Sequence, residues 1–363
     1  GGPAGAVPAA GDGRPDGQCL SEARLRPSDD RDGAPRRSRG DDRGCHPGGD
    51  GGNLSTALSS QVELLLITYN RAPALAETLD RLARSPFAGC RLTVLDNHSS
   101  DETPEVCERF RPRFGDLHVI RHPMNIGANP NYLRAVELSQ AAYTWVVADD
   151  DDLDFSDCED VVAAIEDGEV DLISLGAPGR EDWAPGRTSM GALLSRAARV
   201  FFVFTFMPNT IFRTELFDEE IIAEGYALVP ALYPHFAFFR KQVERDASVL
   251  ISKREIVVRR GRTVPGSELF WFHRWVRCCS TIVDPSVRRD AIYEVRATRG
   301  EWLRSLTVSV IQERLHFPER LWGELAGLAG VLRGRQLAAL VLVAPIGLVP
   351  RSVLGWLRTN LAR

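Results

Sequence analysis

Residues 61–160 alternate short apolar runs with amphipathic segments, and this alternation constrains the fold more than any other feature of the chain. The apolar runs are short and rich in Leu, Ile and Val, which predicts buried strands. The segments between them carry apolar residues on one helical face. Strands that alternate with helices predict a parallel, doubly wound sheet and therefore an α/β fold. The predicted strands are residues 61–68, 91–96, 117–122 and 144–148.

Three local signals predict where helices begin in this region. Pro73 lies near the start of the helix that follows the first strand, a position that proline favours. Asn129 is expected to cap a helix that Pro130 opens. Ser156 and Glu159 match the capping box S/T-x-x-E, which predicts a further helix after the fourth strand.

Polar side chains follow the predicted strands at their carboxyl ends, where doubly wound sheets bind ligands. Four consecutive aspartates after an apolar strand repel one another, so they predict a compensating cation. Oxygen-only ligands suit Mg²⁺ or Mn²⁺, and such an ion would neutralise a phosphate leaving group. The residues at this edge are Thr68, Tyr69, Asn70, Asp96, Asn97, Asp149, Asp150, Asp151 and Asp152.

Simpler interpretations of the same residues stay open. Asp96 and Asn97 could only start a turn, and the aspartate run could be a solvated acidic loop or a helix-capping cluster. A dinucleotide-binding loop is excluded because no glycine follows the first strand, and an EF-hand is excluded because its glycine and glutamate positions hold Asp154 and Asp160. The D-x-D pair of Asp152 and Asp154 leaves a haloacid-dehalogenase-like phosphatase as an alternative.

Roughly residues 62–160 resemble family 2 glycosyltransferases, the inverting enzymes of GT-A fold. The matching segments read ITYNRAPALAETLDRL, VLDNHSSDET and RHPMNIGANPNYLRAVELSQAAYTWVVADDDDL. The resemblance implies a Rossmann-like, mostly parallel sheet flanked by helices. It also implies transfer of a sugar from a nucleoside diphosphate to an acceptor hydroxyl with inversion. The N-x-G segment is similar to that of deoxysugar transferases, which implies surface-polysaccharide or natural-product biosynthesis.

The resemblance also assigns residues to the nucleotide-sugar site. The aspartate after the second strand, Asp96, would accept an N–H from the base, and Gly127 would let the backbone approach the ligand closely. The DXD element implies a metal site at Asp149, Asp150 and Asp151, with Asp151 also expected to act in catalysis and Asp152 as a fourth candidate. The residues expected to line the nucleotide site are Thr68, Tyr69, Asn70, Asp96, Asn97, Asn125, Gly127, Asp149 and Asp150.

The second half of the chain departs from the family pattern. An inverting transferase needs a base that takes the proton of the acceptor hydroxyl, and the usual Glu-Asp pair is not apparent. His235 is the first candidate, as general base or as a further metal ligand; a histidine packed in the core is the alternative. Other candidates are Asp218, Glu219, Glu220 and Glu224. Without a base, the protein would bind nucleotide sugars and not turn them over. The six phenylalanines between residues 201 and 217 indicate core packing.

Composition divides the chain into three parts. Residues 1–58 are expected to form a disordered leader, because the first 52 hold 13 of the 31 glycines and no aromatic residue. Residues 59–265 are expected to form the catalytic domain, with the nucleotide-sugar half at 61–160 and the acceptor half at 161–265. Residues 266–363 are expected to form a helical C-terminal extension. Its apolar segment 336–350 is interrupted by Pro345 and is too short to span a bilayer.

Charge and cysteine content limit the partners. The net charge of −5 does not suggest nucleic-acid binding. Seven cysteines without a C-x-x-C pair predict a reducing, cytoplasmic environment without disulfides or structural zinc. Arginines that flank the 336–350 segment would suit an interfacial helix at the inner face of a membrane, although packing on the catalytic domain explains it equally well. The expected partners are a nucleoside-diphosphate sugar and a sugar, lipid-linked or small-molecule acceptor.

Overall fold

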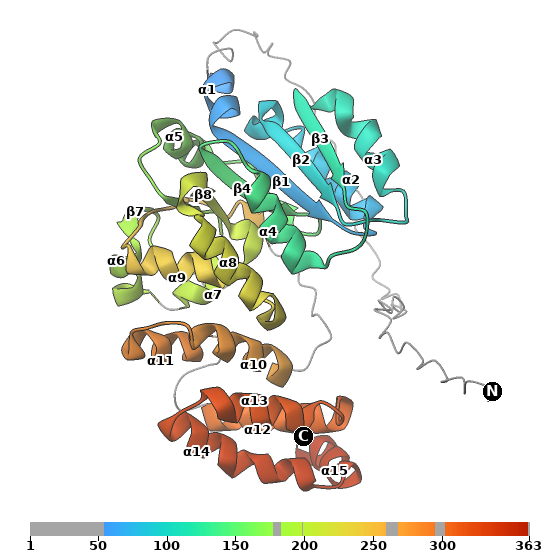
Figure 1. The fold of residues 1–363 in the computed structure, drawn as a ribbon, viewed down its shortest axis with the longest axis vertical. Helices are drawn as coiled ribbons and strands as arrows, with labels where there is room; N and C mark the ends of the chain where they lie inside the picture. Colours follow the sequence, from blue (N-terminus) through green and yellow to red (C-terminus); the bar gives the residue numbers. More distant parts are fainter. Residues whose placement is uncertain (1–53, 177–182, 198, 259–267, 295–301, 362–363) are drawn as a thin grey trace, which may run out of the picture. The chain divides into compact units, whose positions relative to one another are not determined.

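The computed structural model describes residues 54–361 except 177–182, 198, 259–267 and 295–301 (Figure 1). Most of the predicted leader lies outside the described residues. Helix α1 spans Leu54–Gln61, and its Leu58 is only 2% exposed. Regular structure therefore begins earlier than the predicted boundary at residue 59, because Leu58 gives this helix an apolar contact with the core.

The first half of the sheet follows the predicted alternation. Parallel pairing joins β1 to β2 and β4, and β2 to β3. These strands are β1 (Val62–Thr68), β2 (Arg91–Asp96), β3 (Asp116–Arg121) and β4 (Tyr143–Ala148). The intervening helices are α2 (Ala72–Leu82), α3 (Thr103–Phe110) and α4 (Ala128–Leu138), with short turns η1 (Pro86–Gly89) and η2 (Arg111–Arg113). The mostly parallel α/β fold is thus confirmed.

The second half extends the sheet with mixed pairing, in the order β3-β2-β1-β4-β8-β6-β9-β7. Strand β8 is antiparallel to β4 and β6, and β7 is antiparallel to β9. The strands are β6 (Leu172–Ser174), β7 (Gly186–Ser189), β8 (Thr210–Arg213) and β9 (Ser248–Ile251). The helices are α5 (Glu159–Asp167), α6 (Met190–Arg196), α7 (Val200–Phe204), η3 (Met207–Asn209), η4 (Thr214–Leu216), α8 (Glu219–Leu228), η5 (Val229–Ala231) and α9 (Phe236–Glu244).

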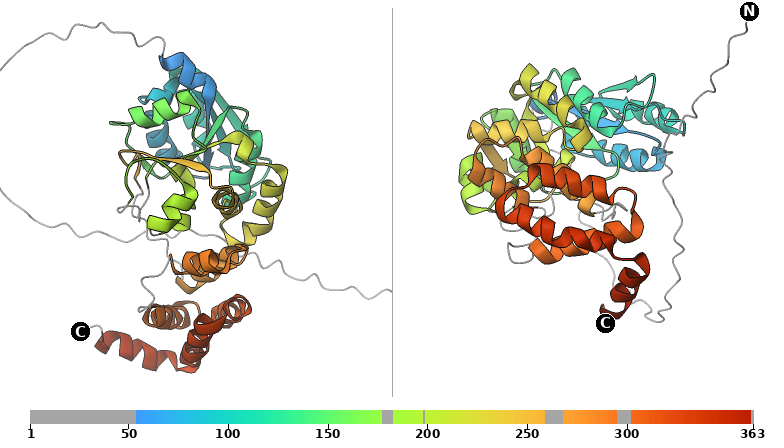
Figure 2. Two further views of the ribbon diagram at one scale, coloured as in Figure 1. Left: turned by 90° about the vertical axis from the view of Figure 1, so that its left-hand side faces the viewer. Right: turned by 60° about the horizontal axis from the view of Figure 1, so that its bottom comes forward.

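Helices cover both faces of the central sheet (Figure 2). Successive side chains of a strand point to opposite faces. In β1, Leu64 and Leu66 accordingly belong to one apolar cluster, and Leu65 and Ile67 belong to another. Helices α2, α3 and α5 contribute to the first cluster, and α4, α8 and α9 contribute to the second. Because both faces are buried, the polar edge formed by the strand ends is the part of this sheet left for a ligand.

Two helix starts differ from the prediction. Helix α4 is capped by Gly127 at φ 89°, with Asn131 N–H donating to the Gly127 carbonyl, so Pro130 lies within the first turn and does not open the helix. Proline is tolerated there because the first N–H groups of a helix have no partner within it. The capping box at Ser156 is absent, since Ser156 N–H donates to Asp154 and α5 begins at Glu159 without a side-chain cap.

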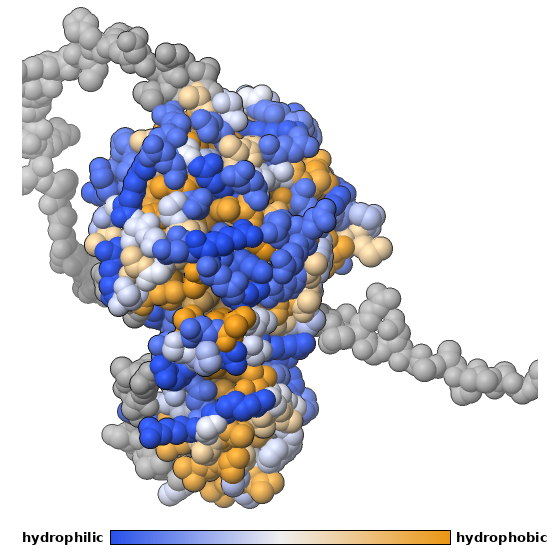
Figure 3. Space-filling model, turned by 60° about the vertical axis from the view of Figure 1, so that its left-hand side comes forward, coloured by the Kyte–Doolittle hydropathy of each residue, from blue (hydrophilic) through white to orange (hydrophobic). Residues whose placement is uncertain are grey.

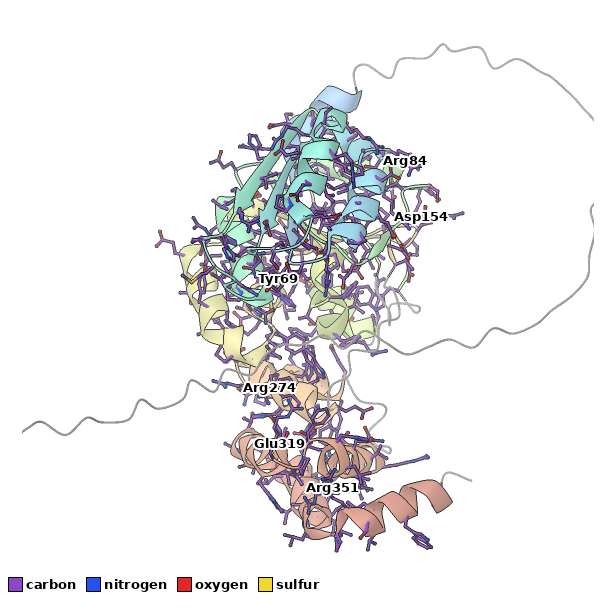
Figure 4. The ribbon with its side chains drawn as sticks, turned by 90° about the vertical axis from the view of Figure 1, so that its right-hand side faces the viewer. Tyr69, Arg84, Asp154, Arg274, Glu319 and Arg351 are labelled. Atoms are coloured by element: carbon purple, nitrogen blue, oxygen red, sulfur yellow. The ribbon has the colours of Figure 1, made fainter. Side chains whose placement is uncertain are left out.

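A separate two-stranded sheet follows the aspartate run. Strand β5 (Asp152–Leu153) pairs with β10 (Val257–Val258). Asp152 therefore lies in a strand and makes an ion pair with Arg81 at 2.8 Å. Asp154 is exposed (Figure 4). The D-x-D pair considered for a phosphatase thus belongs to this small sheet and does not directly follow a strand of the central sheet.

The C-terminal region is helical, as predicted. Its third apolar cluster joins residues of α10 and α12 to Leu228 of α8 and Phe236 of α9. Trp275 packs edge-on against Phe236, with ring centroids 5.6 Å apart. The elements are α10 (Glu268–Cys279), α11 (Pro285–Tyr293), α12 (Trp302–His316), α13 (Leu321–Val331), α14 (Gly334–Val343), η6 (Ala344–Leu348) and α15 (Arg351–Leu361). Among the described residues, no helix combines the length and apolar character needed to cross a bilayer.

Candidate active site

Three neighbouring strands deliver the predicted polar residues to one edge of the sheet. Thr68 at the end of β1 is in register with Asp96 at the end of β2. Ile67 is in register with Ala148, so Asp149 follows at the same level on the other side. This convergence follows from the parallel alignment of the strands, whose carboxyl ends share an edge.

Asp149 is held by three neighbours and is 3% exposed. The Thr68 hydroxyl donates to its Oδ2 at 2.7 Å, Arg71 donates to its Oδ1 at 3.0 Å, and the Thr78 hydroxyl donates to its backbone carbonyl at 3.2 Å. Burial raises the pKa of Asp149, while the contacts with Thr68 and Arg71 favour the ionised carboxylate. The hydrogen bonds from Thr68 and Arg71 thus fix the orientation of the Asp149 carboxylate.

Arg71 brings positive charge to the aspartate run, and sequence reasoning missed it. The same nitrogen, Nη1, contacts Asp149 Oδ1 at 3.0 Å and Asp150 Oδ2 at 2.6 Å. Burial opposes the charged guanidinium, yet the charges of the two aspartates raise its pKa above the ordinary value. Its place directly after the Tyr69-Asn70 pair, at the end of an adjacent strand, was the available signal.

Asp151 is 8% exposed and Asp150 is partly exposed at the same strand end. Within the described part of the chain, no three His, Cys, Asp or Glu side chains are placed to hold a metal ion by themselves. Mg²⁺ usually takes one or two carboxylates and completes its shell with waters and substrate phosphates. The carboxylate oxygens of this aspartate run are donors of the kind that such an ion takes.

Asp96 is 1% exposed, and both of its carboxylate oxygens have partners. Ser99 N–H donates to Oδ1 at 2.8 Å, and Arg121 Nη1 contacts Oδ2 at 3.0 Å. Arg121 also donates to the Ser99 carbonyl at 2.7 Å, which closes the loop after β2. A carboxylate oxygen can accept a second hydrogen bond. These contacts therefore orient Asp96 and leave its oxygens able to accept a further hydrogen bond. Arg121 is a further residue that the sequence did not single out.

The N-x-G segment is shaped by two asparagine side chains. Asn97 Nδ2 donates to Asn125 Oδ1 at 2.8 Å, and Asn97 Oδ1 accepts from Ile126 N–H at 2.9 Å. Gly127 N–H donates to Asn125 Oδ1 at 2.8 Å and has φ 89°, a conformation that favours glycine. The structure thus brings Asn97, Asn125 and Gly127 together as predicted, with the two amides holding the loop.

The loop after β1 presents Tyr69 outward at this edge (Figure 4). Tyr69 is 42% exposed, a large fraction for an aromatic ring. Asn70 adopts φ 51°, and its Oδ1 accepts from Ser100 N–H at 2.7 Å. Asn70 N–H in turn donates to the Ser99 hydroxyl at 2.9 Å. Asn70 therefore ties the loops after β1 and β2 together, while the Tyr69 ring is accessible for stacking.

His235 lies in the core next to helix α9. It is 6% exposed, its Nε2 contacts the Thr205 carbonyl at 2.6 Å, and its ring lies edge-on to Tyr132 with centroids 5.4 Å apart. A carbonyl only accepts, so Nε2 carries the proton. Burial lowers the pKa of His235 to about 4. These contacts favour the alternative that the sequence left open, in which His235 packs in the core and does not act as a general base.

The acidic alternatives to His235 are mostly engaged in ion pairs. Asp218 caps α8 by accepting from Ile221 N–H at 2.9 Å, and that hydrogen bond lowers its pKa. Glu220 pairs with Lys241 at 3.1 Å, and Glu224 pairs with Arg240. These contacts stabilise α8 against α9, and sequence spacing alone could not have revealed them.

The family follows from one comparison. The model for glycosyl transferase family 2 matches residues 64–247, about half of the chain. The chain belongs to glycosyl transferase family 2. The matched region includes the whole polar edge and extends through helix α9.

Curated relatives match over a shorter region. The PGL/p-HBAD biosynthesis glycosyltransferases of Mycobacterium tuberculosis and Mycobacterium bovis are each 29% identical over 101 residues, which is 28% of this chain. The match spans 40% of the length of these relatives.

Solved structures share the fold. Residues 1–349 of TarS from S. aureus, crystallised with UDP-GlcNAc, align with a TM-score of 0.52 at 16% identity, over 78% of this chain and 90% of that one. The same protein with UDP aligns with a TM-score of 0.51 at 16% identity, over 83% and 92% of the two chains. These likenesses support a GT-A fold for this family 2 chain.

Proposed function

We propose that the protein transfers a sugar from a nucleoside diphosphate to an acceptor hydroxyl, with inversion at the anomeric carbon. The acceptor hydroxyl gives its proton to a general base as its oxygen forms the new bond to this carbon. The bond to the diphosphate oxygen breaks, and the diphosphate leaves with the electron pair. The observation that carries the proposal is the meeting of Thr68, Asp96 and Asp149 at the carboxyl edge of three adjacent strands. Family membership supports it.

The nucleoside would lie against the loops after β1 and β2. Tyr69 offers an exposed ring for stacking on the base, and Asp96 offers a charged acceptor for a base N–H. Asn97 and Asn125 would keep the backbone around Gly127 in the shape that admits the nucleotide. The loops are pre-organised by their own hydrogen bonds, which lowers the cost of ordering them on binding.

The aspartates after β4 would face the diphosphate. Asp149, Asp150 and Asp151 would supply carboxylates for Mg²⁺ or Mn²⁺, whose chemistry is to neutralise the departing diphosphate. Thr68 and Arg71 already hold the Asp149 carboxylate in place at this edge. We assign no catalytic step to His235, because its proton is committed to the Thr205 carbonyl.

A second candidate is nucleotide-sugar binding without turnover. It is favoured by one observation: among the described candidates for the base, His235 is buried, and Asp218, Glu220 and Glu224 are paired with cations, which leaves Glu219, an exposed residue in the first turn of α8. Surface-polysaccharide or natural-product biosynthesis would be the setting for either function.

One screen tests both candidates. The full chain is heated with UDP-, GDP- and dTDP-sugars in the presence of Mn²⁺, and any stabilising donor is then offered a panel of sugar, lipid-linked and small-molecule acceptors. We expect one class of nucleotide to raise the melting temperature and an acceptor to release the nucleoside diphosphate. Stabilisation without release for every acceptor would favour the binding protein, and no stabilisation by any donor would contradict both candidates.

We also propose that the C-terminal helices contact an anionic membrane surface. Residues 325–363 contain five arginines and no acidic residue. Figure 3 shows hydrophobic side chains gathered over the helical end of the molecule. The most exposed of them in this region are Val341 (64%), Leu342 (67%), Leu348 (73%) and Trp356 (64%). Exposed apolar side chains flanked by arginines are typical of interfacial helices and would suit a lipid-linked acceptor.

Vesicle sedimentation tests the membrane proposal. The full chain should sediment with vesicles that contain phosphatidylglycerol and should do so less with phosphatidylcholine alone. Leu342→Ser with Trp356→Ser should abolish sedimentation, whereas Val283→Ser, at a 76% exposed site outside these helices, should not. Equal behaviour of the two variants would contradict the proposal. Loss of self-association in the double variant, with no vesicle binding by the parent, would assign the surface to a second copy.

A further inference from the structure

The position of Arg71 Nη1 has a consequence for metal binding. This single atom contacts one oxygen of Asp149 and one of Asp150, at 3.0 and 2.6 Å. A Mg²⁺ ion that bridged the same two oxygens would lie about 2.0–2.1 Å from each. It would therefore need the space that Nη1 fills. The guanidinium and a bridging ion exclude each other at these oxygens.

The backbone around Arg71 is fixed on both sides. Before it, Asn70 Oδ1 accepts from Ser100 N–H at 2.7 Å. After it, Ala72 N–H donates to Asp101 Oδ2 at 2.9 Å. The side chain remains 44% exposed, so it has room to change its rotamer while the backbone stays in place. A guanidinium keeps its charge at all ordinary pH values, so only a change of partner can remove it from the aspartates.

We propose that Arg71 is a built-in counterion that competes with the divalent cation and releases the aspartates when a diphosphate offers the guanidinium new anionic partners. This inference rests on the proposed function. Phosphate oxygens are good acceptors for a guanidinium, often through two parallel hydrogen bonds. The competition makes metal binding weak without nucleotide and strong with it. By linkage, the metal then strengthens nucleotide binding by the same factor.

Arg81 lies in α2, the helix that Arg71 directly precedes, and provides a matched control. Its guanidinium pairs with Asp152 at 2.8 Å and donates to the Leu153 carbonyl at 3.3 Å. It therefore neutralises the same run of aspartates at Asp152, in the neighbouring small sheet. A general loss of positive charge near the run would affect both variants, whereas direct competition affects only Arg71.

Calorimetry with Mn²⁺ tests the inference on the full chain. Mn²⁺ is titrated into the parent, Arg71→Gln, Arg71→Lys and Arg81→Gln, first alone and then with UDP, GDP or dTDP. We expect Arg71→Gln to bind Mn²⁺ alone about tenfold more tightly than the parent, which corresponds to about 1.4 kcal/mol. Arg81→Gln and the charge-conserving Arg71→Lys should stay close to the parent. The effective nucleotide should tighten Mn²⁺ binding less in Arg71→Gln than in the parent.

The outcomes separate this inference from the proposed function. If the parent binds Mn²⁺ with a nucleotide but Arg71→Gln does not bind the metal alone more tightly, Arg71 is not a competitor and metal-assisted transfer stands. If the parent binds Mn²⁺ under none of the conditions, metal assistance fails and the inference fails with it. An equal gain in Arg81→Gln would replace competition by a general charge effect. Thermal melts of each variant check that it is folded.

Discussion

The carboxyl edge of β1, β2 and β4 and the α8–α9 region treat their polar residues in opposite ways. At the edge, Thr68, Asp96 and Asp149 come from three strands and meet at one place. In the α8–α9 region, Glu220 and Glu224 pair with cations of the neighbouring helix. The first arrangement buries Asp96 and Asp149 and makes Asp149 share the Arg71 guanidinium with Asp150, whereas the second leaves its carboxylates at least partly exposed. Buried neighbouring carboxylates cost stability unless a ligand uses their charge, so we infer ligand binding at the edge and structural roles for Glu220 and Glu224.

The aspartate run offers the largest test of this contrast. Asp150→Ala and Asp151→Ala should each lower metal-dependent turnover about 10³-fold, because stabilisation of the leaving diphosphate is worth several kcal/mol. The fold should stay intact, since one member of a crowded carboxylate cluster disappears. Steady-state turnover with saturating Mn²⁺ measures the effect, and Glu220→Ala serves as the control from the other region. Full activity of either aspartate variant, or of the parent in excess EDTA, would contradict a catalytic metal site at the aspartate run.

The pH dependence of stability tests the structural role that we infer for His235, next to α9. The unfolded chain takes up a proton at His235 near pH 6.5, and the folded protein does so only near the lowered pKa of about 4. The stability from neutral His235 is therefore fully present above pH 6.5 and is lost as pH falls toward 4, by about 3 kcal/mol. His235→Gln can still donate to Thr205, so it should remove this dependence and keep its turnover. Denaturant unfolding at pH 7 and pH 4 measures the difference. Equal losses of stability in the parent and the variant would contradict a buried, neutral His235, and a folded but inactive variant would restore its catalytic role.

Two tyrosines of equal exposure provide a smaller and sharper test. Tyr69 at the edge is 42% exposed, and Tyr226 on α8 is 41% exposed. Tyr69→Ala should weaken nucleotide binding about tenfold, since stacking of a base on an aromatic ring is worth about 1–3 kcal/mol. Tyr226→Ala should leave the affinity unchanged. Fluorescence or calorimetric titration compares the two, and equal effects would mean that the Tyr69 ring does not contact the base.

The same contrast explains what the sequence could predict. Strand periodicity and the shared edge of parallel strands are local rules, so β1 to β4 and the meeting of Asp96 with Asp149 were predictable. Arg71 and Arg121 were missed because an arginine carries no periodic signal, and its partner depends on which strands become neighbours. The role of His235 stayed open in the sequence for a related reason: burial against Tyr132 and the Thr205 carbonyl arises from contacts between elements far apart in the chain.

Capping predictions failed where tertiary contacts competed with local ones. Asn129 and Ser156 are good capping residues in isolation. The N-x-G loop, however, is held by Asn97 and Asn125, which moves the cap of α4 to Gly127. Asp154 occupies Ser156 N–H, so the turn before α5 closes without the box.

The most direct test of the central claim is the metal-free affinity of Asp96→Asn for a nucleoside diphosphate. Asp96 is oriented by Ser99 and Arg121, and a charged acceptor is replaced by an amide of nearly equal size. A charge-assisted hydrogen bond is worth about 1.5–3 kcal/mol, so calorimetry should record binding weaker by about ten- to a hundredfold. The loss should be the same with and without Mn²⁺, because contacts to the base do not pass through the metal. An unchanged metal-free affinity would show that Asp96 only builds a turn, and the assignment of the nucleotide to this edge would be wrong.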